Sequence, residues 1–245
     1  MYIIRRKGWE IPESQATPEH VFLDRRNLMR GAAIIGAGTI LPGLSSLAYA
    51  AGDPTEGLYP AKRNETYKLD RDLTPEATAS RYNNFYEFGL SKNVFMQAEQ
   101  LKTRPWTVKI DGLVEKPRDV AIDDLIKAMP LEERLYRHRC VEAWSMTVPW
   151  TGFPLKSLVD FAKPLSSAKF IRFETFLDPK MAPGQRSFFP WPYVEGLTMA
   201  EAVNDLSLMV TGAYGKPLAK TFGAPLRLHT PWKYGFKHEI GRAHV

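Results

Sequence analysis

Cys140 is the only cysteine in a sequence of 245 residues, and its thiol could serve as a nucleophile or as a ligand for a soft metal. Its neighbours are polar and aromatic, in the run RHRCVEAWSM (137–146). An unreactive cysteine behaves as a small hydrophobic side chain, for which such surroundings are unusual. A buried, inert thiol remains one interpretation, but the neighbours favour a chemical role.

Two common uses of a thiol find little support in the sequence. A nucleophilic cysteine needs a general base, and the spacing of His138, His229 and His238 from Cys140 singles out none of them. A structural zinc site needs four ligands at characteristic spacings, which one cysteine and five scattered histidines do not supply. A metal whose other ligands belong to a cofactor needs only one protein thiolate, which fits the cysteine count.

Residues 1–50 predict a signal peptide. The uncharged apolar run GAAIIGAGTILPGLSSLAYA (31–50) follows the paired Arg25 and Arg26 and ends on Ala-Tyr-Ala, so cleavage is expected after Ala50. The arginine pair resembles a twin-arginine signal, whose route exports proteins already folded, often around a cofactor. An uncleaved anchor helix is the alternative, disfavoured by the mild hydrophobicity of the run. A lone thiol exported to an oxidising compartment needs burial or a function.

The remaining sequence predicts an α+β fold dominated by short strands. The 19 prolines and 17 glycines favour short elements, and a hydrophobic content of 44% supports a core. Residues 51–80 are expected to form an extended lead-in to a domain over residues 81–238. The net charge of +6 is scattered along the chain, so no nucleic-acid partner is expected. Sequence patterns predict strands at 106–110, 135–141, 169–176, 207–211 and 225–229, and helices at 122–129 and 154–161.

Four long runs resemble one family. They are YNNFYEFGL (82–90), RCVEAWSMTVPWTGFPL (139–155), PYVEGL (192–197) and GAPLRLHTPWKYGFK (223–237). They closely resemble the catalytic subunits of bacterial periplasmic protein-methionine-sulfoxide reductases, which are molybdoenzymes of the sulfite oxidase fold group. The resemblance covers about residues 80–237 and implies strand-rich mixed sheets with short helices that form a sulfite oxidase-like molybdopterin-binding domain.

The resemblance also implies a cofactor site. Cys140 would give molybdenum a sulfur ligand, and a pterin dithiolene and oxo-type oxygens would complete the shell. The molybdopterin itself would lie along Asn83, Tyr86, Glu87, Thr175 and Arg227. Pterin edges and phosphates need hydrogen-bond donors, acceptors and arginine, which these residues provide. Without the resemblance, Asn83 could cap a turn, Thr175 could be an ordinary strand residue and Arg227 a surface charge.

Two departures from the family pattern stand out. Phe222 takes the place of the family's asparagine before Gly-Ala-Pro, which removes one expected pterin contact. The resemblance ends after Lys237, where the family continues into a stretch that helps to hold the phosphate. The tail EIGRAHV (239–245) resembles a translated sequencing adapter. We therefore expect the domain to be incomplete at its C-terminus and residues 239–245 to be an artefact.

The residues after Cys140 bear on the reaction. Sulfite-oxidising relatives place arginines there for a dianionic substrate, whereas this chain has Glu142 and Trp144. The pattern favours a neutral, polarised S=O group. The resemblance then implies reduction of methionine sulfoxide in oxidised periplasmic proteins by oxygen-atom transfer, with electrons from a membrane haem-binding subunit. The alternatives are a sulfite dehydrogenase and a truncated remnant without cofactor.

Overall fold

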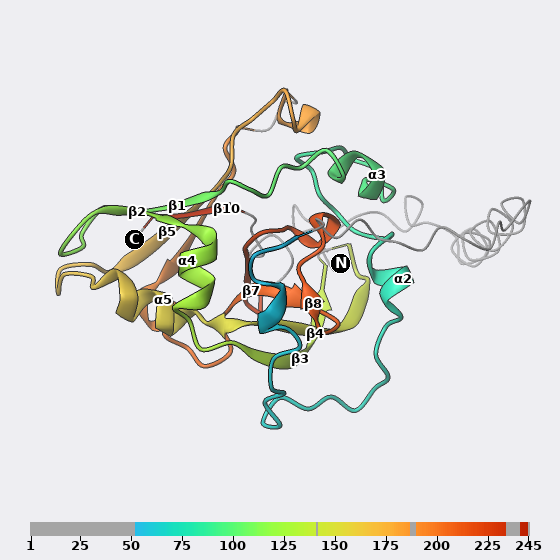
Figure 1. Cartoon of the computed structure of the whole chain (residues 1–245), viewed down its shortest axis with the longest axis horizontal. Coiled ribbons are helices and arrows are strands. Elements are labelled where there is room, and N and C mark those ends of the chain that lie inside the picture. The colour runs from blue at the N-terminus through green and yellow to red at the C-terminus, as the bar shows by residue number, and fades with distance from the viewer. Residues whose placement is uncertain (1–51, 141, 187–189, 234–240, 245) are drawn as a thin grey trace, which may run out of the picture. The chain divides into compact units, whose positions relative to one another are not determined.

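The computed structural model describes residues 52–140, 142–186, 190–233 and 241–244 (Figure 1). The predicted signal peptide lies outside the described residues. Within the described part, no helix is both long and apolar enough to span a membrane. The helices and 3-10 turns are short: η2 (Glu56–Leu58), α2 (Glu76–Ala79), α3 (Phe95–Ala98), α4 (Ile122–Lys127), α5 (Leu155–Ala162), η3 (Pro183–Arg186), α6 (Met199–Ala202) and η4 (Lys220–Phe222).

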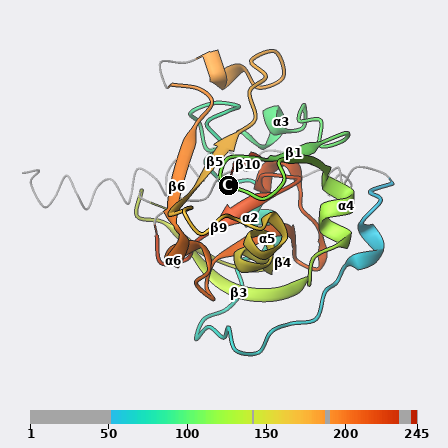
Figure 2. The same cartoon turned by 90° about the vertical axis from the view of Figure 1, so that its left-hand side faces the viewer.

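The strands form three sheets. Those of the largest sheet run in the order β3-β4-β7-β8, with β9 also paired to β7, and those of the second in the order β10-β5-β6, while β1 pairs with β2. Figure 2 shows β5 between β6 and β10. All pairings between these strands are antiparallel, and an isolated parallel bridge joins Arg63 to Glu133. The strands are β1 (Thr107–Ile110), β2 (Arg118–Ala121), β3 (Glu132–Arg139), β4 (Ser145–Pro154), β5 (Phe170–Thr175), β6 (Val194–Thr198), β7 (Leu208–Ala213), β8 (Lys216–Pro217), β9 (Arg227–His229) and β10 (Gly241–His244).

The largest hydrophobic cluster is built from all three sheets together with α4 and α5. Helix α5 buries Leu155, Leu158, Val159 and Ala162, which recur at the spacing of one helical face. It follows Pro154, whose fixed φ suits a helix start, and it ends at Lys163 in the left-handed conformation. The expected helix at 154–161 is therefore confirmed.

Strand β4 lies between β3 and β7 and was not predicted. All eight of its residues from Met146 to Phe153 are buried, so it lacks the alternation of a half-exposed strand. At Gly152 a Cβ atom would lie 2.1 Å from the carbonyl oxygen of Met209 on β7, so only glycine permits this approach. The close packing of β4 against β7 joins the middle of the predicted domain to residues 208–213.

Residues 52–80 contact the large sheet along much of their length. The Tyr59 hydroxyl donates to the Thr211 side chain at 2.8 Å, and the ring of Tyr67 meets that of Tyr136 edge-on at 5.5 Å. The Thr74 hydroxyl accepts a hydrogen bond from the Thr147 backbone N–H at 3.0 Å. The segment carries only the short elements η2 and α2, and these contacts hold it against the sheet.

Candidate cofactor site around Cys140

Cys140 lies in the turn between β3 and β4. The strand expected at 135–141 ends at Arg139, because the N–H of Cys140 donates to the carbonyl of Trp144 at 3.0 Å and closes the turn. Ala143, within this turn, has a φ of 67°. Cys140 is buried whereas Arg139 is exposed, as the alternation of β3 requires. The guanidinium of Arg139 reaches the carbonyl of Pro231 at 3.5 Å.

The Cys140 sulfur faces an amide from a distant part of the chain. Asn84 Nδ2 donates to Sγ at 3.2 Å, and Lys92 in turn donates to Asn84 Oδ1. Lys92 Nζ also lies 2.5 Å from Glu142 Oε2. Asn84 and Lys92 were not predicted as site residues. The paired asparagines at 83–84 were the available signal, but the sequence could not indicate which of the two faces the sulfur.

Glu142 accepts hydrogen bonds from two aromatic side chains. Tyr86 OH donates at 3.4 Å and Trp144 Nε1 at 3.2 Å. The hydrogen bond from Lys92 lowers the pKa of Glu142, and burial raises the pKa of Tyr86. The ring of Tyr82 packs edge-on against Trp144 at 5.4 Å. The Glu142 carboxylate, two positions after Cys140, is thus surrounded by aromatic side chains.

Asn83 turns away from the sulfur and toward η4. Its Nδ2 donates to Thr221 Oγ1 at 2.6 Å and to the carbonyl of Ser80 at 3.3 Å. Asn83 Oδ1 is buried and has no hydrogen-bond partner among the described residues. A buried acceptor without a partner is costly, so this oxygen suits a donor from a bound molecule.

Arg227, the first residue of β9, is held by Phe222, the residue that departs from the family pattern. Its Nη1 donates to the carbonyl of Phe222 at 3.0 Å, and its guanidinium lies 5.7 Å from the centre of the Trp150 ring. The Phe222 ring packs edge-on against Trp150 at 5.7 Å. Phe222 therefore positions Arg227 through its backbone, which the substitution leaves intact. The Nε of Arg227 is buried without a partner among the described residues.

Glu87 and Arg227 carry opposite charges in a poorly solvated region. Burial raises the pKa of the Glu87 carboxyl to about 7, although the positive charge of Arg227 opposes the shift. Burial likewise lowers the pKa of Arg227 to about 10, against the charges of Glu87 and Cys140. Among the described ion pairs, none joins Glu87 to Arg227. The two side chains interact through space, and neither neutralises the other by contact.

Thr175, the last residue of β5, is connected to the site through η3. Its hydroxyl accepts from the Tyr193 N–H at 3.1 Å. Gln185 Nε2 donates to the carbonyl of Phe176 at 2.7 Å, and the N–H of Gly184 donates to the carbonyl of Glu87 at 2.8 Å. Gly184 is required at this approach, since a Cβ there would lie 2.1 Å from the Tyr86 carbonyl oxygen. The backbone of β10 also lies here, with Gly241 opposite Thr175.

The predicted residues thus belong to one neighbourhood. Contacts and charges connect Cys140, Tyr86, Glu87 and Arg227. Asn83 reaches η4 beside Phe222, and Thr175 adjoins the η3 contact to Glu87. The buried Asn83 Oδ1 and Arg227 Nε offer an acceptor and a donor without protein partners among the described residues. Together with an available thiol, this set fits a polar cofactor that brings a metal.

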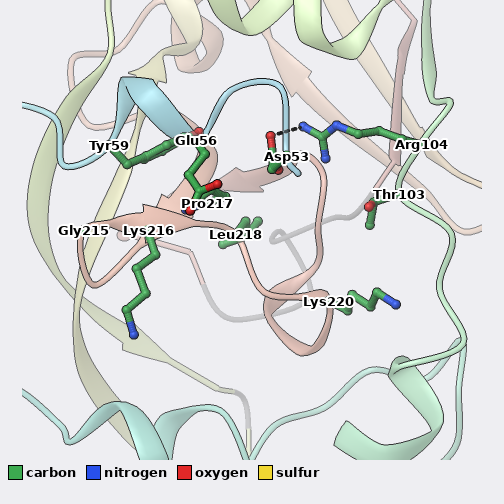
Figure 3. A pocket seen from close by; sticks show the side chains of 10 residues that line it. All are labelled: Asp53, Glu56, Tyr59, Thr103, Arg104, Gly215, Lys216, Pro217, Leu218 and Lys220. Carbon is green, nitrogen blue, oxygen red and sulfur yellow. Dashed lines mark hydrogen bonds and ion pairs between the residues drawn. The ribbon is translucent and has the colours of Figure 1, made fainter. Parts of the chain in front are cut away.

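A separate cavity of about 220 Å³ lies between η2, Arg104 and β8 (Figure 3). None of the six predicted site residues lines it. Its cations are already paired: Arg104 with Asp53 and Asp123, Lys216 with Glu76, and Lys220 with Glu99. Figure 3 shows the contact between Asp53 and Arg104, both of which line the cavity. The cavity adjoins η4 but is no part of the surroundings of Cys140.

Comparison with known proteins shows which family the chain belongs to. The model of the oxidoreductase molybdopterin binding domain matches residues 95–239. The protein-methionine-sulfoxide reductase catalytic subunit of Pseudomonas syringae pv. tomato is 48% identical over 240 residues, covering 92% of this chain and 71% of that protein. The crystal structure of the sulfane dehydrogenase SoxCD from Paracoccus pantotrophus aligns with a TM-score of 0.53 and 15% identity.

That alignment covers 94% of this chain and 59% of the SoxCD chain, so this chain spans less than two thirds of the solved structure that it matches. At 15% identity the likeness concerns the fold alone. The family model matches more than half of the chain, and the predicted strand-rich α+β fold is confirmed. The chain therefore belongs to the oxidoreductase molybdopterin binding domain family and is a molybdopterin-binding oxidoreductase.

Proposed function

We propose that this chain reduces methionine sulfoxide in proteins to methionine, with Cys140 as the thiolate ligand of molybdenum. The 48% identity to a protein-methionine-sulfoxide reductase catalytic subunit supports the substrate class. The burial of the free thiol beside a polar, incompletely satisfied neighbourhood supports the role of Cys140. A molybdenum–pterin group, when bound, supplies two-electron exchange of an oxygen atom.

The five other predicted residues would hold this group. Asn83 Oδ1 can accept from a pterin N–H, and the guanidinium of Arg227 can donate to a pterin or phosphate oxygen. Tyr86 and Glu87 follow Asn83 in the same segment, and Thr175 approaches from β5. The raised pKa of Glu87, about 7, keeps a share of its carboxyls protonated near neutral pH, so Glu87 can donate as well as accept.

The groups around the Cys140 sulfur favour a sulfoxide over sulfite as the substrate. The sulfur accepts a hydrogen bond from a neutral amide, that of Asn84, and the turn after Cys140 carries no arginine but Glu142, which is paired with Lys92. Arg139 points instead to the Pro231 carbonyl. A dianion such as sulfite would find no arginine on this turn, and the ammonium group of Lys92 beside it is already paired with Glu142, whereas a sulfoxide is neutral and needs only hydrogen-bond donors.

The same proposal includes export and partners. Residues 1–50 would direct the folded protein to the periplasm by the twin-arginine route. Oxidised periplasmic proteins would be the substrates, and a membrane haem-binding subunit would deliver the two electrons that, with two protons, convert the sulfoxide oxygen to water. Replacing Arg25 and Arg26 by lysines should retain the protein in the cytoplasm, and export at the normal rate would contradict this part.

The experiment is a comparison of substrates with metal analysis. Purified protein should contain molybdenum and should oxidise a reduced dye when given a methionine-sulfoxide-containing protein, but should not reduce a dye when given sulfite. Cys140→Ser should lose the sulfoxide activity. Sulfite-dependent dye reduction would favour a sulfite dehydrogenase. Absence of molybdenum after expression in a cofactor-competent host would favour a remnant without cofactor.

A further inference from the structure

Lys92 connects Asn84, which donates a hydrogen bond to the Cys140 sulfur, to Glu142, which lies two positions after Cys140 in the chain. Its ammonium contacts Asn84 Oδ1 and lies 2.5 Å from Glu142 Oε2. The side chain of Lys92 is 27% exposed and that of Glu142 is 34% exposed, so both are partly withdrawn from solvent. Among the described contacts, none joins Lys92 to Cys140 itself. The hydrogen bonds of Lys92 therefore reach the sulfur through Asn84.

The two ends of the Asn84 amide have different chemistry. The Oδ1 end only accepts hydrogen bonds and the Nδ2 end only donates them, whereas an ammonium group only donates. Lys92 can therefore bind Asn84 at Oδ1 alone, which leaves Nδ2 to face Sγ at 3.2 Å. If the amide turned over, Oδ1 would face an electron-rich sulfur and Nδ2 would face a cation. Both contacts would then be repulsive, so Lys92 favours the observed orientation of the amide, and a hydrogen bond from Asn84 to the Glu142 carboxylate favours it too.

Glu142 holds Lys92 in this position. Its carboxylate also accepts from Trp144 Nε1 at 3.2 Å and from Tyr86 OH at 3.4 Å, so donors from separate parts of the site converge on one side chain. A flexible lysine tethered at two oxygens loses most of the freedom of its four-carbon stem. The result is a chain of contacts from Glu142 through Lys92 and Asn84 to the sulfur of Cys140.

We propose that Lys92 is a positioning residue, which orients the Asn84 amide so that its N–H is directed at the Cys140 sulfur. The inference rests on the proposed function in one respect, that Cys140 is the thiolate ligand. A hydrogen bond to a ligating sulfur stabilises the sulfur lone pairs and tunes the metal. Loss of this bond should shift sulfur-to-molybdenum charge-transfer absorption to lower energy and lower the reduction potential.

Three substitutions of Lys92 distinguish the loss of a hydrogen-bond donor to Asn84 from the mere replacement of the lysine side chain. Lys92→Gln keeps N–H donors for Asn84, Lys92→Met removes them, and Lys92→Glu offers mainly an acceptor that favours the reversed amide. Lys156→Met is the matched control, because Lys156 is an exposed lysine paired with Asp160 at 2.6 Å on α5. Since Lys92 is partly exposed, all four variants are expected to fold.

Two measurements follow. In the cofactor-free full chain, the Asn84 side-chain amide is observed by NMR and assigned by its absence in Asn84→Asp. In the loaded protein, the charge-transfer band is recorded per molybdenum. We expect both signals to shift in Lys92→Met, to shift further in Lys92→Glu, and to stay near wild type in Lys92→Gln and Lys156→Met. The kcat should fall about 10-fold or more in Lys92→Met, with little change in KM.

The outcomes separate this inference from the proposed function. Wild-type amide signals in Lys92→Met and Lys92→Glu, or a Lys92→Gln variant as altered as Lys92→Met, would overturn the positioning role. Failure of the wild-type protein to bind molybdenum would instead defeat the proposed function, and the NMR series would still decide whether Lys92 orients Asn84.

Discussion

Asn84 Nδ2 donates a hydrogen bond to Cys140 Sγ at 3.2 Å, across 56 positions of sequence. The contact joins the segment before α3 to the turn between β3 and β4, which are the two segments that carry most of the predicted site. Because the sulfur is the proposed metal ligand, Asn84 stands where a small change in geometry acts directly on the reactive centre.

Removal of the Asn84 amide should impair the site without unfolding the protein. We expect Asn84→Ala to lower activity or molybdenum affinity about 10–100-fold, the usual cost of losing a partner of a metal ligand. Asn93→Ala is the control, since Asn93 is exposed in the same segment. Activity and metal content per protein are the measurements, and equal values for the two variants would speak against a role for the Asn84 contact.

Glu87 should make the stability of the cofactor-free protein depend on pH. Its pKa is about 7 in the folded chain against an ordinary value of 4.5, so between these values the folded state binds more protons than the unfolded state. The free energy of unfolding should therefore fall as the pH rises from about 4.5 to about 7 and then level off. The total change is about 3 kcal/mol.

Urea denaturation across this pH range measures the effect. Glu87→Gln, which stays neutral, should remove most of the slope. A slope that persists unchanged in Glu87→Gln would assign the pH dependence to other groups.

The close approach at Gly184 should tolerate no side chain. In Gly184→Ala the new methyl would lie 2.1 Å from the Tyr86 carbonyl oxygen and 2.7 Å from that of Glu87, so the segment carrying both residues must move. We expect a loss of about 1–3 kcal/mol in the free energy of unfolding and weaker cofactor retention. Gly57→Ala is the matched control, since nothing lies within 4 Å of its added Cβ. Similar unfolding curves for both variants would refute the argument.

Arg227 should not be replaceable by lysine. Arg227→Lys keeps a positive charge but removes the buried Nε and the planar group that contacts the Phe222 carbonyl. We expect about tenfold less molybdenum retained per protein after purification. Arg63→Lys alters an ion pair with Glu133 outside the site and should retain wild-type metal content. Full retention in Arg227→Lys would remove Arg227 from the proposed cofactor contacts.

Local patterns predicted part of the fold well. Pro154 at the start of a short run indicated α5, alternation indicated β1, and the strand expected at 135–141 overlaps β3. Strand β4 was missed because burial on both faces removes the alternation that marks a strand, and because Pro149 and Pro154 suggest breaks. Such a strand is defined by its two neighbours in the sheet, which no local window contains.

In the site too, local features could be predicted from the sequence, whereas contacts between distant residues could not. The run around Cys140 is a local signal, and its composition already pointed to a ligand thiol. The Lys92–Glu142 pair and the Asn84–Cys140 bond join residues about 50 positions apart, and only the folded chain brings them into contact. The loss of a cofactor contact at Phe222 stays a prediction, and the structure adds that the Phe222 carbonyl accepts a hydrogen bond from Arg227, which the sequence did not indicate.

X-ray absorption at the molybdenum edge tests the central claim most directly. If Cys140 is the thiolate ligand, the metal in the wild-type protein should show one more sulfur neighbour than in Cys140→Ser, and the lost sulfoxide activity should accompany the lost sulfur. The same number of sulfur neighbours in both proteins would show that Cys140 does not bind the metal, and would contradict the account.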